Sequence, residues 1–296
     1  MTNFVSKTGT GTSDRLRRPA GLRALRLGEL TVTYVPDGAV QLAPRAWLPA
    51  STEQTWAEHP EYLDDSGNLV ASIGGLLVEH GDRALLVDAG FGPRSAPAEP
   101  GNPHGAIYGG ALLDNLAELG RRPDEIEAVA ITHLHLDHVG WAAHPAPGSD
   151  RPAFTNAEYR IAEPEWSGRH LAEAAGTSAE QLAALAPRVR TAADGEEIFP
   201  GVRLLAAAGH TVGHASYVIS SGGQRLIAFG DAMHSSIQIE HPDWGAAPDH
   251  DPVAAADARR RLVAELAEPG TIGFGVHFAD VVFGQVAADG TWRPVS

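Results

Sequence analysis

The chain has 296 residues, no cysteine and a formal charge of −15, from 37 acidic and 22 basic residues. An apolar fraction of 43% is ample for a sizeable core, and the absence of cysteine excludes disulfides and thiolate metal ligands. The acidic balance provides no basic stripe for a phosphate backbone, so we expect no nucleic-acid partner.

Residues 1–26 are expected to form a flexible N-terminal leader, and residues 27–296 a single domain. The leader mixes Thr, Ser, Gly and Arg and lacks the continuous apolar stretch of a signal peptide. No later segment approaches the length of a membrane span. The sequence therefore predicts a cytoplasmic protein with no membrane partner, and it leaves a homodimer open.

The first half of the chain alternates short apolar runs with turns. The first strand is expected to end at Pro36-Asp37-Gly38, and a loop follows over 43–68. A later hairpin brings Asp88 to a strand end. The predicted elements are strands over 30–35, 72–79, 84–87 and 128–131 and a helix over 110–119.

The second half repeats this pattern. Thr177 and Glu180 have the spacing of a capping box, and Asp251 with Pro252 marks the start of a long helix that closes at Gly270. The predicted elements are strands over 154–161, 202–206, 215–219, 225–229 and 271–276 and helices over 163–175, 177–188 and 252–269. No linker separates the halves, which predicts two mixed sheets packed together with helices outside.

The stretch Thr132-His-Leu-His-Leu-Asp-His-Val-Gly140 directly follows a predicted buried strand. It places His133, His135, Asp137 and His138 within six positions. Imidazole nitrogens and carboxylate oxygens suit zinc and its first-row neighbours, and burying four such groups without partners would be costly. The stretch therefore predicts a metal site.

Three further residues of ligand type follow short apolar strands later in the chain: His210, Asp231 and His277. A single buried histidine is usually a hydrogen-bonded core residue, so each alone would be weak evidence. Together with the first cluster they predict one site assembled from several strand ends.

The ordered pattern HxHxDH, GHTxGH, GD and a terminal His, with Asp88 before it, resembles the metallo-β-lactamase superfamily from about Leu30 to the end of the chain. The resemblance implies an α/β fold, a four-layer αββα sandwich with two metal ions at one edge. Its motif positions imply the following roles: His133, His135 and His210 bind the first ion, Asp137, His138 and His277 bind the second, Asp231 bridges them, and Asp88 and His214 support the ligands.

The resemblance also implies a dinuclear metal-dependent hydrolase. Zinc is the first expectation, and manganese, iron or cobalt would also suit this donor set. A hydroxide that bridges the two ions would attack a lactone, a carboxyl ester or a phosphotriester, and Asp137 or Asp231 would carry the proton. The expected partner is thus a small-molecule ester or lactone.

One residue departs from a branch of this family. Quorum-quenching lactonases of the superfamily usually have a tyrosine where His234 stands, and the segment 230–244 looks more like the branch that includes methyl parathion hydrolase. His234, Trp244, Trp47 and Phe278 flank the strand ends and are the candidate substrate-binding residues, although each suits ordinary packing too.

Two other functions stay open at this point. A thioesterase or biosynthetic acyl hydrolase would use the same centre on a different carbonyl. A non-catalytic binding protein would retain the fold without the reaction.

Overall fold

The structure is a computed structural model that describes residues 11–295. Its strands are β1 (Arg23–Leu27), β2 (Leu30–Leu42), β3 (Leu69–His80), β4 (Arg83–Val87), β5 (Ser95–Ala96), β6 (His104–Tyr108), β7 (Ala128–Ile131), β8 (Glu158–Ala162), β9 (Val189–Ala192), β10 (Glu197–Phe199), β11 (Val202–Ala206), β12 (Ala215–Ser221), β13 (Gln224–Ala228), β14 (Thr271–Phe274), β15 (Phe283–Val286) and β16 (Trp292–Pro294).

Its α-helices are α1 (Thr12–Arg15), α2 (Pro44–Trp47), α3 (Glu53–Glu58), α4 (Leu112–Glu118), α5 (Leu136–Val139), α6 (Glu163–Ser167), α7 (Ala179–Leu185) and α8 (Pro252–Leu266). Its 3-10 helices are η1 (Pro60–Tyr62), η2 (Pro123–Glu125), η3 (Arg169–Ala175), η4 (Ala186–Arg188), η5 (Gly230–Ala232) and η6 (Ser236–Ile239). Within the described residues no helix is long and apolar enough to cross a membrane.

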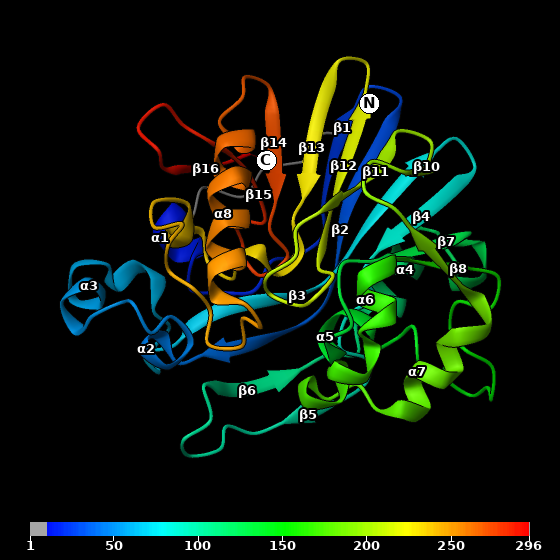
Figure 1. Ribbon diagram of the computed structural model, residues 1–296, viewed down its shortest axis with the longest axis horizontal. Coiled ribbons are helices and arrows are strands. Elements are labelled where there is room, and N and C mark those ends of the chain that lie inside the picture. Colours follow the sequence, from blue (N-terminus) through cyan, green and yellow to red (C-terminus); the bar gives the residue numbers. More distant parts are fainter. Residues whose placement is uncertain (1–10, 296) are drawn as a thin grey trace.

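The strands between residues 11 and 295 form two mixed sheets (Figure 1). The first has the order β5-β6-β2-β3-β4-β7-β8-β9, with β1 also paired to β2, and the second has the order β10-β11-β12-β13-β14-β15-β16. Parallel pairs join β4 to β7, β7 to β8, β8 to β9 and β13 to β14. Because parallel strands run in one direction, the segments that follow them emerge at the same edge of a sheet.

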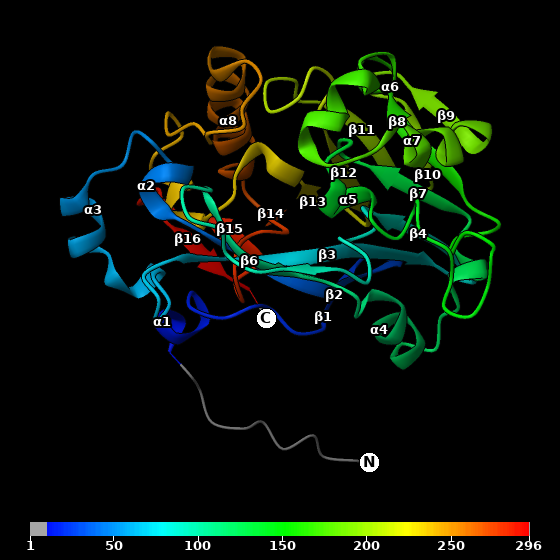
Figure 2. The ribbon, with the colours of Figure 1, turned by 90° about the horizontal axis from the view of Figure 1, so that it is seen from below.

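Buried side chains fill three interfaces between layers. Alternate residues of β2, such as Val32 and Tyr34, pack between the sheets against residues such as Tyr217 of β12. Leu116 of α4 lies in a cluster on the outer face of the first sheet, and Leu262 of α8 in a cluster on the outer face of the second. The four-layer αββα sandwich is therefore confirmed, and Figures 1 and 2 show α8 and α4 on opposite sides of the sheets.

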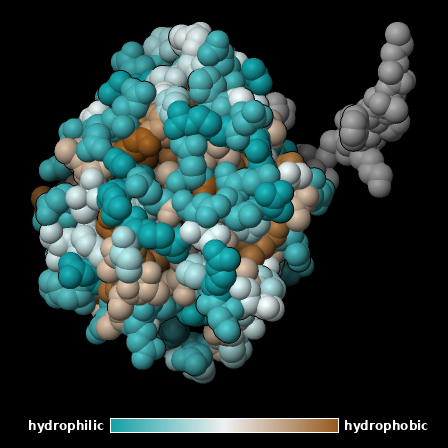
Figure 3. Space-filling view, turned by 90° about the vertical axis from the view of Figure 1, so that its right-hand side faces the viewer, coloured by the Kyte–Doolittle hydropathy of each residue, from teal (hydrophilic) through white to brown (hydrophobic). Residues whose placement is uncertain are grey.

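The hydropathy of one face of the molecule agrees with this layered arrangement. The face shown in Figure 3 is largely hydrophilic, with separate small hydrophobic areas. On this face, apolar residues thus turn toward the core rather than forming one broad exposed patch.

Several local predictions differ from the structure, among them the helix expected over 163–175, which is divided into α6 and η3. The strand that was expected to end at residues 36–38 continues as β2 to Leu42, because a register shift between Pro36 and Gly38 absorbs the irregularity. The expected loop over 43–68 contains α2, α3 and η1. The capping box of α7 uses Ser178 and Gln181, whereas the Thr177 hydroxyl donates to the carbonyl of Leu134.

The predicted leader lies partly outside the described residues. From residue 11 onward it is structured, since α1 precedes β1 and β1 pairs antiparallel with β2. Ala20 is buried, and Arg15, Arg18 and Arg23 all contact Asp280. Residues 11–26 therefore differ from the expected flexible leader, because they pack onto the sheets.

A buried carboxylate joins the middle of β2 to three other segments. Asp37 is 1% exposed, and its Oδ2 accepts hydrogen bonds from the amides of Phe91 and Gly92, at 2.7 and 3.0 Å. Its Oδ1 accepts from the amides of Gly110 and Leu112 and from Nε1 of Trp141, at 2.8–2.9 Å. The carboxylate thus fixes the loop after β4, the start of α4 and the segment after α5.

We expect Asp37→Ala to lower the free energy of unfolding by about 3 kcal/mol or more, because it leaves several buried donors unpaired. Urea denaturation followed by tryptophan fluorescence measures this change. Asp65→Ala is the control, since the Asp65 side chain is fully exposed and should leave the transition nearly unchanged. Equal effects of the two substitutions would contradict this role for Asp37.

Candidate metal centre

The residues of the predicted site lie at one edge of the two sheets. Thr132 follows β7 and leads into a loop with His133 and His135 and then into α5 with Asp137 and His138, while His277 follows β14. Asp231 lies in η5, directly after β13. His210 comes from the loop between β11 and β12. Strand ends from both sheets therefore bring together residues that are up to 144 positions apart, the separation of His133 and His277.

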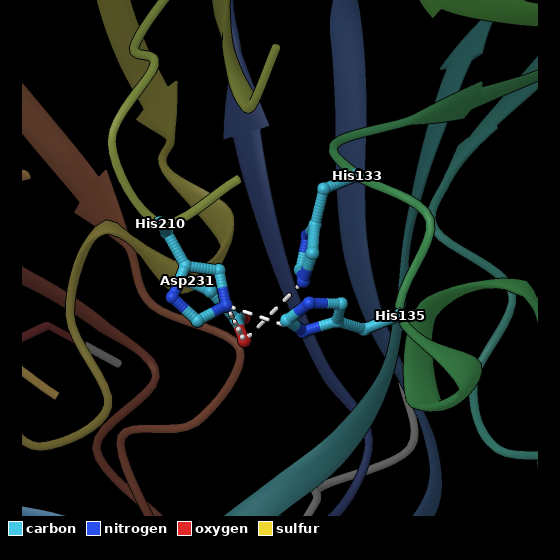
Figure 4. A group of neighbouring side chains, drawn as sticks. All are labelled: His133, His135, His210 and Asp231. Carbon is cyan, nitrogen blue, oxygen red and sulfur yellow. Dashed lines mark hydrogen bonds and ion pairs between the residues drawn. The ribbon is translucent and has the colours of Figure 1, made fainter. Parts of the chain in front are cut away.

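The first group consists of His133, His135, His210 and Asp231, whose ligand atoms all lie within 4.8 Å of one another. Figure 4 shows these four side chains pointing toward a common centre. Nε2 of His210 lies 3.2 Å from Nδ1 of His135 and 3.3 Å from Oδ2 of Asp231. Nε2 of His133 lies 3.5 Å from the same oxygen. Four donor atoms thus surround one point.

The second group consists of Asp137, His138 and His277, which also meet within 4.8 Å. Nε2 of His138 and Nε2 of His277 each lie 3.0 Å from Oδ1 of Asp231. The two carboxylate oxygens of Asp231 therefore face different groups: Oδ2 faces the first and Oδ1 faces the second. A carboxylate that joins two ions needs this arrangement.

The buried donor atoms fit divalent ions. His133 Nε2, His138 Nε2 and Asp231 Oδ1 are buried, and their close contacts lack the geometry of a hydrogen bond. Burial lowers the pKa of His133 well below its usual value and that of His135 to about 3. Burial opposes ionisation of Asp231, but the imidazoles of His138 and His277 hold the pKa of this carboxyl well below its usual range. Neutral imidazoles and an ionised carboxylate are the metal-binding forms.

The pKa values of three other histidines, His210, His138 and His277, are raised instead. Burial lowers the pKa of His210, but hydrogen bonds to Asp231 and Asp249 outweigh it and raise the pKa to about 9. For His138, burial is likewise outweighed by Asp231 and Asp137, and its pKa rises well above the usual value. An ion bound at these nitrogens must therefore displace protons.

Each of three imidazoles has a second nitrogen held by a different partner. Nδ1 of His138 lies 2.9 Å from Oδ2 of Asp88, the carboxylate that was expected near a ligand. Nδ1 of His277 donates to the carbonyl of Ser72, at 2.8 Å. Nδ1 of His133 lies 3.0 Å from the hydroxyl of Thr132. These contacts leave Nε2 of each ring turned toward the centre.

The sequence did not predict the carboxylate that contacts Nδ1 of His210, which is that of Asp249. Nδ1 of His210 lies 3.0 Å from Oδ1 of Asp249, whose Oδ2 accepts from Nη1 of Arg259 at 3.0 Å. Both Asp249 and Arg259 are buried, and Arg259 comes from α8. No motif marks Asp249, which stands 39 positions after His210. The only signal was an arginine among the apolar positions of a helix.

A second missed residue joins two ligand loops. Glu165 is buried in α6, and its Oε1 accepts from the amide of Leu134 at 2.9 Å. Its Oε2 accepts from the hydroxyl of Thr211 and the amide of Gly213, at 2.6 and 3.0 Å. A Cβ on Gly213 would lie 2.0 Å from the Glu165 nitrogen, so only glycine permits this approach. Glu165 therefore ties the His133–His135 loop to the His210 loop.

His214 and His234 both contact the η5 segment. Nε2 of His214 accepts from the amide of Asp231 at 3.1 Å, and its Nδ1 lies 3.2 Å from the carbonyl of Ala207. Nε2 of His234 lies 3.1 Å from Oδ2 of Asp231. The His234 ring stacks on His277 with centroids 5.4 Å apart and meets the Trp47 ring edge-on. His214 thus supports the backbone, whereas His234 forms a third group of possible ligands with Asp231 and His277, whose ligand atoms lie within 4.8 Å of one another.

A cavity of about 490 Å³ opens onto both groups. Its lining includes His135, Asp137, His210, Asp231, His277, Trp47, His104 and His234, and an apolar part formed by Val40, Leu42, Ala71, Leu171, Ala172 and Val212. Trp47 and His234 therefore lie where substrate contact was expected. The apolar part was missed because its residues come from unrelated segments.

Two of the predicted substrate-binding residues lie away from the cavity lining. Phe278 is 1% exposed and packs against Phe229 and Trp292 in the core beneath α8. Trp244 stacks on His241, with ring centroids 3.9 Å apart. Substrate contact by Phe278 and Trp244 is thus not what this geometry supports, since packing occupies both rings.

The comparisons with known proteins agree with this geometry. The family model described as the metallo-beta-lactamase superfamily matches residues 76–275. An N-acyl homoserine lactonase of Bacillus sp is 30% identical over 180 residues, covering 56% of this chain and 65% of that protein. One from Bacillus thuringiensis is 28% identical over 202 residues, covering 63% and 73%. The chain thus spans about two thirds of the length of these relatives.

Solved structures share the fold over nearly the whole chain. AidC, described as a dizinc quorum-quenching lactonase in complex with a product, has a TM-score of 0.78 at 24% identity and covers 94% of this chain and 98% of its own. AbOPH, described as a hydrolase in the beta lactamase superfamily, has a TM-score of 0.77 at 27% identity with the same coverage. These likenesses confirm the fold expected from the histidine and aspartate motifs.

We expect Asp249→Ala to weaken retention of divalent metal by about 10- to 100-fold, because His210 loses the carboxylate that orients it. Chelator competition on the purified protein measures the change. The matched control is Asp257→Ala on α8, whose exposed carboxylate pairs only with Arg260 among the ion pairs found and should leave retention unaltered. Unchanged retention in Asp249→Ala would exclude the orienting role.

Proposed function

The chain belongs to the metallo-beta-lactamase superfamily and is a metal-dependent hydrolase, and we propose that it opens lactone rings at a centre of two divalent ions. The observation that carries the two-ion proposal is the position of Asp231. Its Oδ2 faces His133 and His210, and its Oδ1 faces His138 and His277.

The proposed ligand set follows the two groups of side chains. His133, His135 and His210 would hold the first ion and Asp137, His138 and His277 the second, and Asp231 would contribute to both. Zinc suits these donors, and manganese, iron and cobalt suit them as well. When bound, such a pair of ions supplies a strong nucleophile at neutral pH and polarises the carbonyl oxygen under attack.

Proton transfer is assigned to Asp137. Its side chain is 22% exposed and lines the cavity, whereas that of Asp231 is 4% exposed with both oxygens among imidazoles. An accessible carboxylate can exchange a proton with solvent or with the leaving alkoxide, while a buried one between two groups of ligands cannot readily do so.

His234 and Trp47 are assigned to substrate binding. His234 is buried beside Asp231 and has an unpartnered Nδ1, and burial lowers its pKa to about 4, so the ring is neutral at pH 7. Trp47 packs edge-on against this ring and fixes its plane. A neutral imidazole at this position can hydrogen-bond a polar atom of the substrate.

The substrate class is assigned from the relatives and the cavity together. Two of the relatives are named N-acyl homoserine lactonases. The apolar part of the cavity, which includes Leu171 and Val212, suits a lactone with an apolar substituent. Carboxyl esters, phosphotriesters and thioesters present a similar electrophile and are the alternatives for the substrate test.

We expect chelator-stripped protein to lose at least about 100-fold of its kcat/KM for a lactone and to recover on addition of Zn²⁺, Mn²⁺ or Co²⁺. Hydrolysis of an acyl lactone, an aryl ester, an acyl thioester and a phosphotriester is measured in parallel. Full activity after stripping would contradict metal dependence. A clear preference for the thioester would replace the lactone assignment, and no turnover of any substrate by metal-loaded protein would favour a binding function.

We expect His234→Ala to lower kcat/KM for the preferred substrate by about 100-fold, the scale of losing one well-placed hydrogen-bonding group. His234→Tyr should retain more activity than His234→Ala, because the phenol supplies a polar group at the same place. The control His80→Ala alters a partly exposed histidine that pairs with Glu29. Wild-type kinetics in His234→Ala would remove this residue from the substrate site.

A further inference from the structure

His277 differs from the other oriented histidines in what holds it. Nδ1 of His138 and of His210 each meet a carboxylate, whereas Nδ1 of His277 donates to a main-chain carbonyl, that of Ser72 in β3. A carboxylate side chain can change its rotamer when the histidine ring moves, whereas a main-chain carbonyl cannot. The position of His277 therefore depends on how its loop is fixed relative to β3.

The loop after His277 has a conformation that needs support. Ala279 has a φ of 42°, in the left-handed region that non-glycine residues rarely adopt. Such a conformation persists where surrounding contacts hold it. The Ser72 hydroxyl donates to the Ala279 carbonyl at 2.9 Å, and Ser72 Oγ accepts from the amide of Ala20 at 2.8 Å. One serine thus connects the N-terminal segment to this loop.

The N-terminal segment holds the next residue from several directions. Asp280 is 2% exposed, and its amide donates to the carbonyl of Arg15 at 3.1 Å. The Arg15 guanidinium donates back to the Asp280 carbonyl, with Nε at 2.9 Å. Arg18 and Arg23 each donate through Nε and Nη2 to the Asp280 carboxylate, at 2.5–3.1 Å. Three guanidinium groups thus surround a residue three positions after His277.

We propose that residues 15–23, together with Ser72, position His277 for the second ion. This rests on the two-ion site proposed above. The contacts reach His277 and none of the first-group histidines, because His133 and His210 are held by Thr132 and Asp249, and Glu165 holds the amide of Leu134 next to His135. Loosening this segment therefore weakens binding of the second ion and leaves binding of the first unchanged.

The test is a Zn²⁺ titration of metal-free, full-length protein against a chromophoric chelator, which resolves two stepwise dissociation constants. Arg15→Gln and Ser72→Ala should each raise the second dissociation constant by about 10- to 100-fold and leave the first within about threefold of its wild-type value. Arg26→Gln is the control, because Arg26 lies outside residues 15–23, contacts Gly28 and Thr31 at the surface, and should change neither constant.

Each result bears on the proposal. Equal weakening of both constants, or no weakening of either, in both variants would overturn the positioning role. Ser72→Ala keeps the main-chain carbonyl that accepts from His277. Thermal unfolding checks that each variant is folded. Loss of binding of the first Zn²⁺ together with a lowered unfolding midpoint would indicate general destabilisation and count against the proposal. A wild-type chain that holds only one Zn²⁺ would overturn the two-ion site itself.

Discussion

The rest of the site depends on one buried carboxylate. Asp231 is 3% exposed, and five histidines of the described chain lie within 3.5 Å of its carboxylate oxygens: His133, His138, His210, His234 and His277. An isolated buried carboxylate would be strongly destabilising, so it requires compensating positive charge. Imidazoles from both sheets converge on it, and bound cations would supply the charge that neutral imidazoles lack.

The converging imidazoles are held by contacts that differ in origin. Asp88 follows β4 and orients His138, while Asp249 precedes α8 and orients His210 with Arg259 behind it. Glu165 ties two ligand loops together. These partners come from different elements of the sandwich. The geometry of the site therefore depends on how the layers pack together.

The substrate side of the site follows other constraints. Trp47 and His234 contact each other at the cavity wall, and the apolar residues Leu171 and Val212 come from segments without any shared motif. Trp244 and Phe278, which share the aromatic character of Trp47, are occupied by packing with their neighbours. Trp47, Leu171, His234 and Val212 thus come from α2, η3 and loops that meet only in the folded chain.

The ordered histidine and aspartate motifs, through the family that they resemble, predicted the four-layer fold and the side chains that meet at the site, and these residues follow short apolar strands, as in residues 128–138. The contacts that support those side chains became visible only in the folded chain. Asp37 with Trp141, His210 with Asp249, and Arg23 with Asp280 are 104, 39 and 257 positions apart. Such pairs leave no periodicity or local spacing to recognise, since folding alone brings them within hydrogen-bonding distance.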